Sequence, residues 1–135
     1  MPDHDASPRA TIESVFTAID AGAIDEAIKY FSSDIMIQFA NIGPLTGPAA
    51  FADLYEQFAG TVQGVRHDIH NIWSVVENPD AAVSQATAHY TLQNGNQVSL
   101  PCCNIFRLSG GLISEYRVFM DITPALSAAT ATSAM

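Results

Sequence analysis

The chain has 135 residues, of which 48% are hydrophobic, enough apolar material for one domain with a single core. Fourteen acidic residues against five scattered basic ones give a net charge of −9, which makes nucleic acid and anionic membrane surfaces unfavourable partners. No apolar run approaches the roughly 20 residues of a membrane-spanning helix, and the N-terminus lacks the basic and apolar regions of a secretion signal, so we expect a cytoplasmic protein.

The first part of the chain predicts two helices followed by a strand. Ser7 followed by Pro8 is typical of a helix start with Ser7 as the N-cap, and apolar residues then recur at helical spacing until Gly22. Residues 24–31 have the apolar spacing of a short second helix. The β-branched segment 35–40 predicts the first strand.

The next segment predicts a loop and a third helix. Residues 41–48 are rich in Gly and Pro, which break both the helical and the strand pattern. The helix that follows ends at Gly60 and carries an apolar stripe along one face. This stripe consists of Phe51, Leu54, Tyr55 and Phe58.

From about residue 65 the pattern changes to strands. We expect strands over residues 65–76, 82–93, 97–108 and 112–122. The dipeptides Asn94-Gly95 and Gly110-Gly111 are strong hairpin signals, so these strands form an antiparallel meander with the helices on one face. We therefore predict one α+β domain over residues 1–126. Residues 127–135 carry no charge and no aromatic ring, and we expect them to form a disordered tail.

The cysteines and histidines do not form a metal-binding pattern. Adjacent strand residues point to opposite faces, so Cys102 and Cys103 do not easily join each other, and we expect both to be core thiols. His67 and His70 have a spacing that aligns ligands on a helix, whereas their segment predicts a strand. No phosphate-binding glycine loop occurs either. We therefore expect neither a metal nor a nucleotide cofactor.

The last predicted strand has two unlike faces. Because successive side chains of a strand alternate, its charged face carries Glu115, Arg117 and Asp121, with Phe119 beside them. Its apolar face consists of Ser114, Tyr116, Val118 and Met120. We expect the charged face to form a polar patch inside an apolar cleft; the alternative is that this face is solvated.

Four segments carry a resemblance to a known family: AGAID (residues 21–25), FSSDI (31–35), LTGP (45–48) and GLISEYR (111–117). With the element order, they make residues 7–126 resemble the nuclear transport factor 2-like superfamily, in particular its SnoaL-like branch. The resemblance implies a cone-shaped α+β barrel, with three N-terminal helices on a strongly curved mixed or antiparallel sheet around a deep apolar pocket. It also implies a homodimer, in which the apolar face of the last strand meets the partner and the charged face lines the pocket. The fold occurs in isomerases, polyketide cyclases, dehydratases, hydrolases and non-enzymatic binding proteins.

Limonene epoxide hydrolase offers a residue-by-residue comparison. Its Tyr-x-Asn corresponds to Phe39-Ala40-Asn41, and its Arg-x-x-x-Asp to Arg117 and Asp121; in that enzyme the Asn and Asp hold and deprotonate a water. Its central Arg-x-Asp, whose Asp protonates the epoxide, is replaced by His89-Tyr90-Thr91, where only a protonated His89 supplies an acid. Epoxide opening is therefore an alternative function.

Steroid delta-isomerase is a poorer match. Its oxyanion Tyr, its base Asp and its second oxyanion acid correspond to Val15, Phe39 and Asn104. The base and the main acid are therefore missing, and steroid isomerisation by that mechanism is not expected. Asn104 can still donate a hydrogen bond to a carbonyl or enolate oxygen.

The charged residues suggest catalytic roles. We expect Asp121 to be the general base, with a pKa raised by apolar neighbours such as Phe119 or lowered by Arg117; the alternative is a structural ion pair with Arg117. His89 is expected to be the acid or the proton shuttle, unless its face is exposed to solvent. Arg117 and Asn104 would orient the substrate or stabilise an oxyanion.

Other residues are expected to bind the substrate. His67 and His70 lie on opposite faces of their strand, and the apolar neighbours of His67 favour it as the residue in the pocket. The full predicted set is Asn104, Asn41, His67, Phe39, Tyr55, Phe119 and Phe16. The alternatives are core packing for the aromatic residues, a core hydrogen bond for Asn104 and a turn for Asn41.

The leading hypothesis is a cofactor-independent enzyme that performs acid–base chemistry on a hydrophobic small molecule. Isomerisation, cyclisation and dehydration or hydration all fit this description. A non-catalytic ligand-binding or dimerisation module is the alternative from another class, in which the polar residues form a satisfied network. A pocket with a perturbed Asp121 and a water or ligand atom within hydrogen-bond reach would favour the enzyme, and a filled, collapsed core would favour the module.

Overall fold

The computed structural model describes residues 7–130. The helices are α1 (Pro8–Asp20), α2 (Ile24–Ala27), the 3₁₀ helix η1 (Ile28–Tyr30), α3 (Pro48–Phe58) and α4 (Thr123–Thr130). The strands are β1 (Phe31–Phe39), β2 (Ile42–Thr46), β3 (Val62–Val75), β4 (Asn78–Leu92), β5 (Gln97–Ser109) and β6 (Leu112–Phe119). The predicted α+β class and the hairpins that join the last strands are confirmed.

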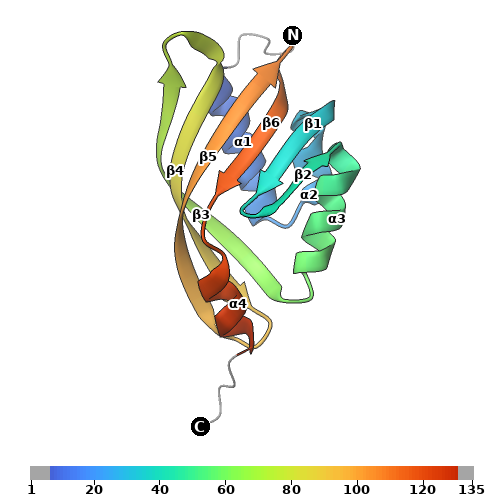
Figure 1. The fold of residues 1–135 in the computed structure, drawn as a ribbon, viewed down its shortest axis with the longest axis vertical. Helices are drawn as coiled ribbons and strands as arrows, with labels where there is room; N and C mark the ends of the chain where they lie inside the picture. Colours follow the sequence, from blue (N-terminus) through green and yellow to red (C-terminus); the bar gives the residue numbers. More distant parts are fainter. Residues whose placement is uncertain (1–6, 131–135) are drawn as a thin grey trace.

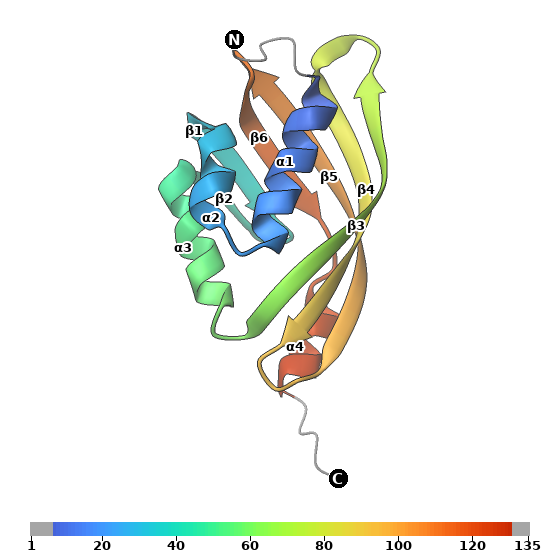
Figure 2. The same cartoon turned by 180° about the vertical axis from the view of Figure 1, so that it is seen from behind.

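The strands form one six-stranded mixed sheet in the order β2-β1-β6-β5-β4-β3. All neighbours are antiparallel except β1 and β6, which run parallel. Helices α1, α2 and α3 cover one face of this sheet, and α4 packs at the end of the long β4–β5 hairpin (Figures 1 and 2). The sheet curls but does not close, because β2 and β3 remain as its edges, so the expected barrel is an open cone.

Helix α1 shows how local sequence and packing agree. It begins after Ser7, whose Oγ accepts a hydrogen bond from the Ala10 N–H at 3.4 Å, and Pro8 occupies its first turn. Gly22 follows the helix with φ +72°, a conformation that other residues adopt only with strain, and turns the chain away. The side chains that α1 buries against the sheet are Thr11, Ile12, Val15, Phe16 and Ile19.

Aromatic rings join α1 to the sheet in the core. Phe106 on β5 and Tyr116 on β6 stack with ring centroids 4.7 Å apart. Phe16 meets both of them edge-on, at 6.0 and 6.4 Å. Because offset-stacked and edge-on geometries suit the charge distribution of aromatic rings, this cluster sets the distance between α1 and the sheet.

Residues 42–46 form β2, where a loop was predicted. The strand pairs antiparallel with β1, with Leu45 opposite Ile37. Pro44 is tolerated because β2 is an edge strand, where a missing N–H need not break the sheet ladder. Gly43 lies very close to β1, since a Cβ there would be 2.8 Å from the Ile37 carbonyl oxygen. Gly43 and Pro44 are therefore compatible with an edge strand that lies close to β1.

The prediction that residues 127–135 are disordered is wrong for the part that belongs to α4, and residues 131–135 lie outside the described residues. The Ala128 carbonyl oxygen accepts hydrogen bonds from Asn94 Nδ2 at 2.8 Å and from Asn96 Nδ2 at 3.0 Å. The helix is thus held by the β4–β5 hairpin. The composition of α4 does not indicate that Asn94 and Asn96 are its hydrogen-bond partners.

The two cysteines differ in environment. Cys102 is buried, as expected, whereas Cys103 is exposed, so the expectation that both are core thiols is wrong for Cys103. The reason is the alternation of strand side chains, which sends only one of two neighbours to the inner face. Both cysteines are free.

Candidate active site

A cavity of about 820 Å³ lies between the inner face of the sheet and the helices. Its size falls in the range of about 300–1,000 Å³ that small-molecule sites occupy. The wall is mainly apolar, and its apolar side chains include Ile19, Ile37, Phe39, Phe51, Phe58 and Val118. The structure thus contains a pocket and not a filled core, but Asp121, which was expected in this pocket, does not line it.

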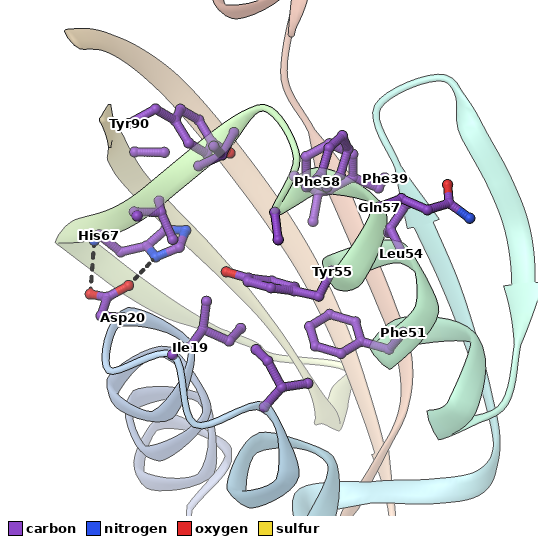
Figure 3. Close-up of a pocket in the computed structure, with 18 of the residues that line it drawn as sticks. Ile19, Asp20, Phe39, Phe51, Leu54, Tyr55, Gln57, Phe58, His67 and Tyr90 are labelled. Carbon is purple, nitrogen blue, oxygen red and sulfur yellow. Dashed lines mark hydrogen bonds and ion pairs between the residues drawn. The ribbon is translucent and has the colours of Figure 1, made fainter. Parts of the chain in front are cut away.

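His67 and Asp20 form a close pair in the cavity wall (Figure 3). The carboxylate of Asp20, at the C-terminal end of α1, accepts the backbone N–H of His67 at 2.8 Å and lies 2.6 Å from His67 Nδ1. Both side chains are largely enclosed, with 11% of His67 and 25% of Asp20 exposed. The Phe16 ring packs against the imidazole, with ring centroids 4.6 Å apart. The ring is therefore held at several points.

This geometry selects one form of the imidazole. An ionised carboxylate only accepts hydrogen bonds, so the proton of a neutral His67 lies on Nδ1. The other ring nitrogen, Nε2, then carries a lone pair. Figure 3 shows this nitrogen on the side of the ring away from Asp20. His67 can therefore take up a proton while Asp20 stabilises the resulting charge.

Three tyrosines, Tyr55, Tyr90 and Tyr116, also line the cavity. Burial is the main cause that raises the pKa of all three phenols well above the ordinary value. They therefore stay protonated and act as hydrogen-bond donors. The Tyr90 hydroxyl lies 3.9 Å from Met120 Sδ, and the Tyr55 hydroxyl points towards the His67 and Asp20 pair (Figure 3).

Asn104 reaches the same cavity from β5, as predicted. Only 1% of it is exposed, and its Nδ2 donates to Ser84 Oγ at 3.0 Å. Asn104 therefore both makes a core hydrogen bond and lines the cavity. Burial raises the pKa of the neighbouring Cys102 thiol despite a hydrogen bond from Asn104, so this thiol is neutral.

The prediction for the last strand is inverted. Tyr116 and Val118 are buried and line the cavity, as does Met120, whereas Arg117 and Phe119 face the other side of the sheet. The prediction that the charged face lines the pocket and the apolar face meets a partner is therefore wrong. The alternation of strand side chains places the apolar and the charged residues of β6 on opposite faces. The position of α1 determines which of these faces is inside.

The expected catalytic residues do not line the cavity. Arg117 pairs with Glu115 at 3.2 Å on the outer face. Asp121 lies beyond β6, fully exposed, and hydrogen bonds from Thr123, including one from the backbone N–H at 3.0 Å, lower its pKa. His89 Nδ1 lies 2.7 Å from Ser99 Oγ on the outer face of the sheet. Asp121 lies beyond the strand because β6 ends at Phe119, earlier than predicted.

The predicted binding residues divide into two groups. His67, Asn104, Phe39 and Tyr55 line the cavity, and His70 is exposed beside Thr87, so the choice of His67 over His70 is confirmed. The others, Asn41, Phe119 and Phe16, do not line it. Asn41 is exposed in the β1–β2 turn, where Asn is a common turn former, and Phe16 packs beneath His67.

The family model of the SnoaL-like domain matches residues 12–116 of this chain. The protein belongs to the SnoaL-like family. No curated protein matches the chain. Solved structures share its fold at low identity. An NTF2-like protein of unknown function from Burkholderia pseudomallei K96243 superposes with a TM-score of 0.82 at 13% identity, over 91% of this chain and 97% of that one.

Two further solved structures resemble the SnoaL-like protein. An LEH-like epoxide hydrolase from M. tuberculosis has a TM-score of 0.72 at 18% identity, covering 88% of this chain and 86% of the other. A protein with a ketosteroid isomerase-like fold from Catenulispora acidiphila DSM 44928, solved with trimethylamine, has a TM-score of 0.78 at 13% identity, covering 92% and 94%. At these identities the likeness shows the fold.

Sequence reasoning missed Asp20, Tyr90 and Tyr116 in the site of this SnoaL-like protein. One signal was present for Asp20. It ends helix α1, where the partial negative charge of the helix dipole disfavours a carboxylate. A carboxylate at an unfavourable position suggests that another contact compensates, and here that contact is with His67. His67 is 47 residues away from Asp20 along the chain, so the local sequence does not indicate this contact.

The described part of the SnoaL-like protein offers no metal centre. Among residues 7–130, no three His, Cys, Asp or Glu side chains are grouped closely enough to hold a metal ion. Within the same residues, no helix is both long enough and apolar enough to span a membrane.

Proposed function

We propose that this SnoaL-like protein is an enzyme that performs acid–base chemistry on a hydrophobic small molecule in the cavity. Isomerisation, cyclisation and dehydration or hydration are the reactions in question, since each requires a proton to be taken from one atom and returned to another. The observation that carries the proposal is the 2.6 Å contact between His67 Nδ1 and Asp20 in the wall of an apolar cavity. No cofactor takes part in the proposed step.

His67 is the proposed base. Its Nε2 takes a proton from the carbon next to a carbonyl group, and Asp20 stabilises the imidazolium that forms. One Asp20 oxygen contacts the imidazole, the other accepts the His67 backbone N–H, and the Phe16 ring packs against the imidazole, so little reorganisation is needed when the charge appears.

The sequence-based assignment placed the base elsewhere. Asp121, His89 and Arg117 lie outside the cavity, and their placement does not support the roles predicted for them. Epoxide opening relied on Asn41 and Asp121, which are both exposed. No observation in the cavity therefore favours epoxide opening over proton transfer by His67.

The test measures proton transfer directly. Purified protein is incubated in D₂O with 2-tetralone, a neutral bicyclic ketone, and exchange of the protons next to the carbonyl is followed by NMR. The parent should accelerate exchange above the buffer rate, and His67→Gln should slow the accelerated rate by roughly 10²–10⁴-fold. His70→Gln is the matched control, because His70 lies on the same strand but is exposed outside the cavity.

Two results would count against the proposal. Binding of bicyclic ketones without exchange would identify a non-catalytic binding protein. Exchange that survives His67→Gln would place the base elsewhere, and Asp121→Asn and His89→Gln would then be examined.

We also propose a homodimer formed through the outer face of the sheet. Trp73 lies opposite Val83 on this face, Val83 opposite Ile105, and Phe119 opposite Cys103. Trp73 and Phe119 are 49% and 50% exposed, although both are large and apolar. A row of apolar side chains across four strands is the kind of surface that another subunit covers.

A further inference from the structure

The inner part of the cavity contains polar groups that no protein group satisfies. Tyr116 is 4% exposed, yet its hydroxyl has no hydrogen bond to any described residue, and the same is true of the Tyr55 hydroxyl. Within the described residues, every fully enclosed side-chain nitrogen or oxygen has a partner. Both hydroxyls must therefore open onto the cavity. A buried phenol left without a partner needs one from a ligand or from water.

The two hydroxyls belong to one small region. Tyr55 on α3 and Tyr116 on β6 pack against the same ring, Phe51, with centroid distances of 5.5 and 6.2 Å. After burial, a charge on Tyr55 is the largest cause that raises the pKa of Tyr116, so the two groups lie within electrostatic reach of each other. Because both phenols stay protonated, the region offers two donors to one acceptor atom.

The charges around the cavity set a second condition on the ligand. The acidic side chains in its wall are Asp20, Asp25 and Glu56, and none of the five basic residues of the chain lines it. The basic residues are Arg9, Lys29, Arg66, Arg107 and Arg117. Among the described residues that line the cavity, only His67 can become a cation, and it is already paired with Asp20. A buried carboxylate, phosphate or sulfate would therefore find no free counter-charge.

We propose that Tyr55 and Tyr116 bind the carbonyl oxygen of an uncharged hydrophobic ligand, and that the cavity rejects the corresponding anions. The ligand class is a neutral ketone or quinone. This inference deepens the function proposed above, because it concerns the substrate of the same cavity. It assigns the two tyrosines to the oxygen, whereas His67 faces the neighbouring carbon.

The experiment compares naphthalene probes of similar shape by isothermal titration calorimetry. 2-Acetonaphthone carries the carbonyl, 2-ethylnaphthalene lacks it, and 2-naphthoate replaces it with an anion. Tyr116→Phe should weaken binding of 2-acetonaphthone by about threefold to tenfold, the effect of one neutral hydrogen bond, and leave 2-ethylnaphthalene unchanged. The parent should bind 2-naphthoate roughly 100-fold more weakly than the ketone, because the anion would be buried unpaired.

Tyr30→Phe is the matched control. Tyr30 is partly buried but does not line the cavity, so its loss of a hydroxyl should leave binding of all probes unchanged. Equal effects of Tyr116→Phe on the ketone and on 2-ethylnaphthalene would overturn the proposal. Binding of 2-naphthoate as tight as that of the ketone would also overturn it, as would tighter binding of 2-naphthylmethylammonium.

The outcome is separable from that of the proposed function. Exchange of 2-tetralone and selectivity among the naphthalene probes are measured separately on the parent protein, so either one can fail without the other. A parent that discriminates between the probes but does not catalyse exchange would support the binding inference and contradict the proposed enzyme. A parent that catalyses exchange but does not discriminate between the probes would support the enzyme and contradict the binding inference.

Discussion

Asp20 illustrates how one side chain can define a site. Its two oxygens accept from the backbone and lie against the ring of the same residue, His67. The backbone contact fixes the strand relative to α1, and the ring contact fixes the position of the imidazole proton. Catalytic geometry and the docking of α1 onto β3 therefore depend on one carboxylate.

Asp20→Asn should abolish most proton transfer while the fold survives. The Asn carbonyl can accept from one His67 donor, but its amide then donates towards the other contact. If this amide faces Nδ1, the imidazole proton moves to Nε2, which removes the lone pair that the cavity requires. We expect the exchange rate to fall by roughly 10²-fold or more. Asp25→Asn, which alters another carboxylate of the cavity wall, is the control and should exchange like the parent.

At the scale of the element, α4 is positioned by its two ends. Asp121 accepts the Thr123 N–H at the start of the helix, at 3.0 Å. At the other end, Asn94 and Asn96 bind the Ala128 carbonyl oxygen. Between these ends, Ala125 is 3% exposed and lines the cavity. A helix of low amphipathicity is thus docked by hydrogen bonds to residues outside it.

Asp121→Ala tests whether this residue holds the helix. Hydrogen bonds from Thr123 lower the pKa of Asp121 in the folded state, so its stabilising effect is present above the pKa of the unfolded chain and is lost as the pH falls through the lower folded value. The melting temperature of the variant should lie below that of the parent at neutral pH, and the gap should narrow in acid. Unchanged ketone exchange in this variant would argue against a catalytic Asp121, and its loss would argue for one.

Removing α4 should weaken both stability and binding. Deletion of residues 125–135 exposes the cavity surface that Ala125 and Leu126 cover and frees the hairpin amides. We expect a loss of roughly 1–3 kcal/mol in the free energy of unfolding and weaker binding of 2-acetonaphthone. Deletion of residues 131–135 alone is the comparison, with thermal melts and calorimetry as the measurements. Equal behaviour of the two truncations would show that α4 does not close the cavity.

At the scale of the whole molecule, the two faces of the sheet have separate tasks. The concave face buries Tyr116 and Val118 and forms the cavity, while the convex face carries Trp73 and Phe119. The charged residues of the last strand lie on the convex face, where Glu115 contacts both Arg107 and Arg117.

Phe119→Glu should dissociate the proposed dimer. An unpaired carboxylate in an apolar interface costs several kcal/mol, so the variant should sediment as a monomer at micromolar concentration where the parent sediments as a dimer. Val76→Glu is the control, because Val76 is 97% exposed and lies in the β3–β4 turn. A parent that is monomeric at that concentration would remove the dimer from the proposal.

Much of the fold could be read from local signals. The Ser7 cap, the Gly22 end of α1 and the Asn94-Gly95 hairpin depend on a few consecutive residues, and each lies where the sequence places it. Four of the seven predicted binding residues also line the cavity: His67, Asn104, Phe39 and Tyr55. Their positions could be predicted because helix and strand periodicity separate side chains into faces before any tertiary contact forms.

Which face becomes the inside was decided only by the tertiary structure. The sequence separates Tyr116 from Arg117, but the packing of α1 against the sheet determines that Tyr116 is enclosed. The contact between Asp20 and His67, and the docking of α4 on Asn94, join residues that are 47 and 34 positions apart. Local periodicity carries no information about such contacts, because they depend on how far the sheet curls and on which elements its curvature brings together.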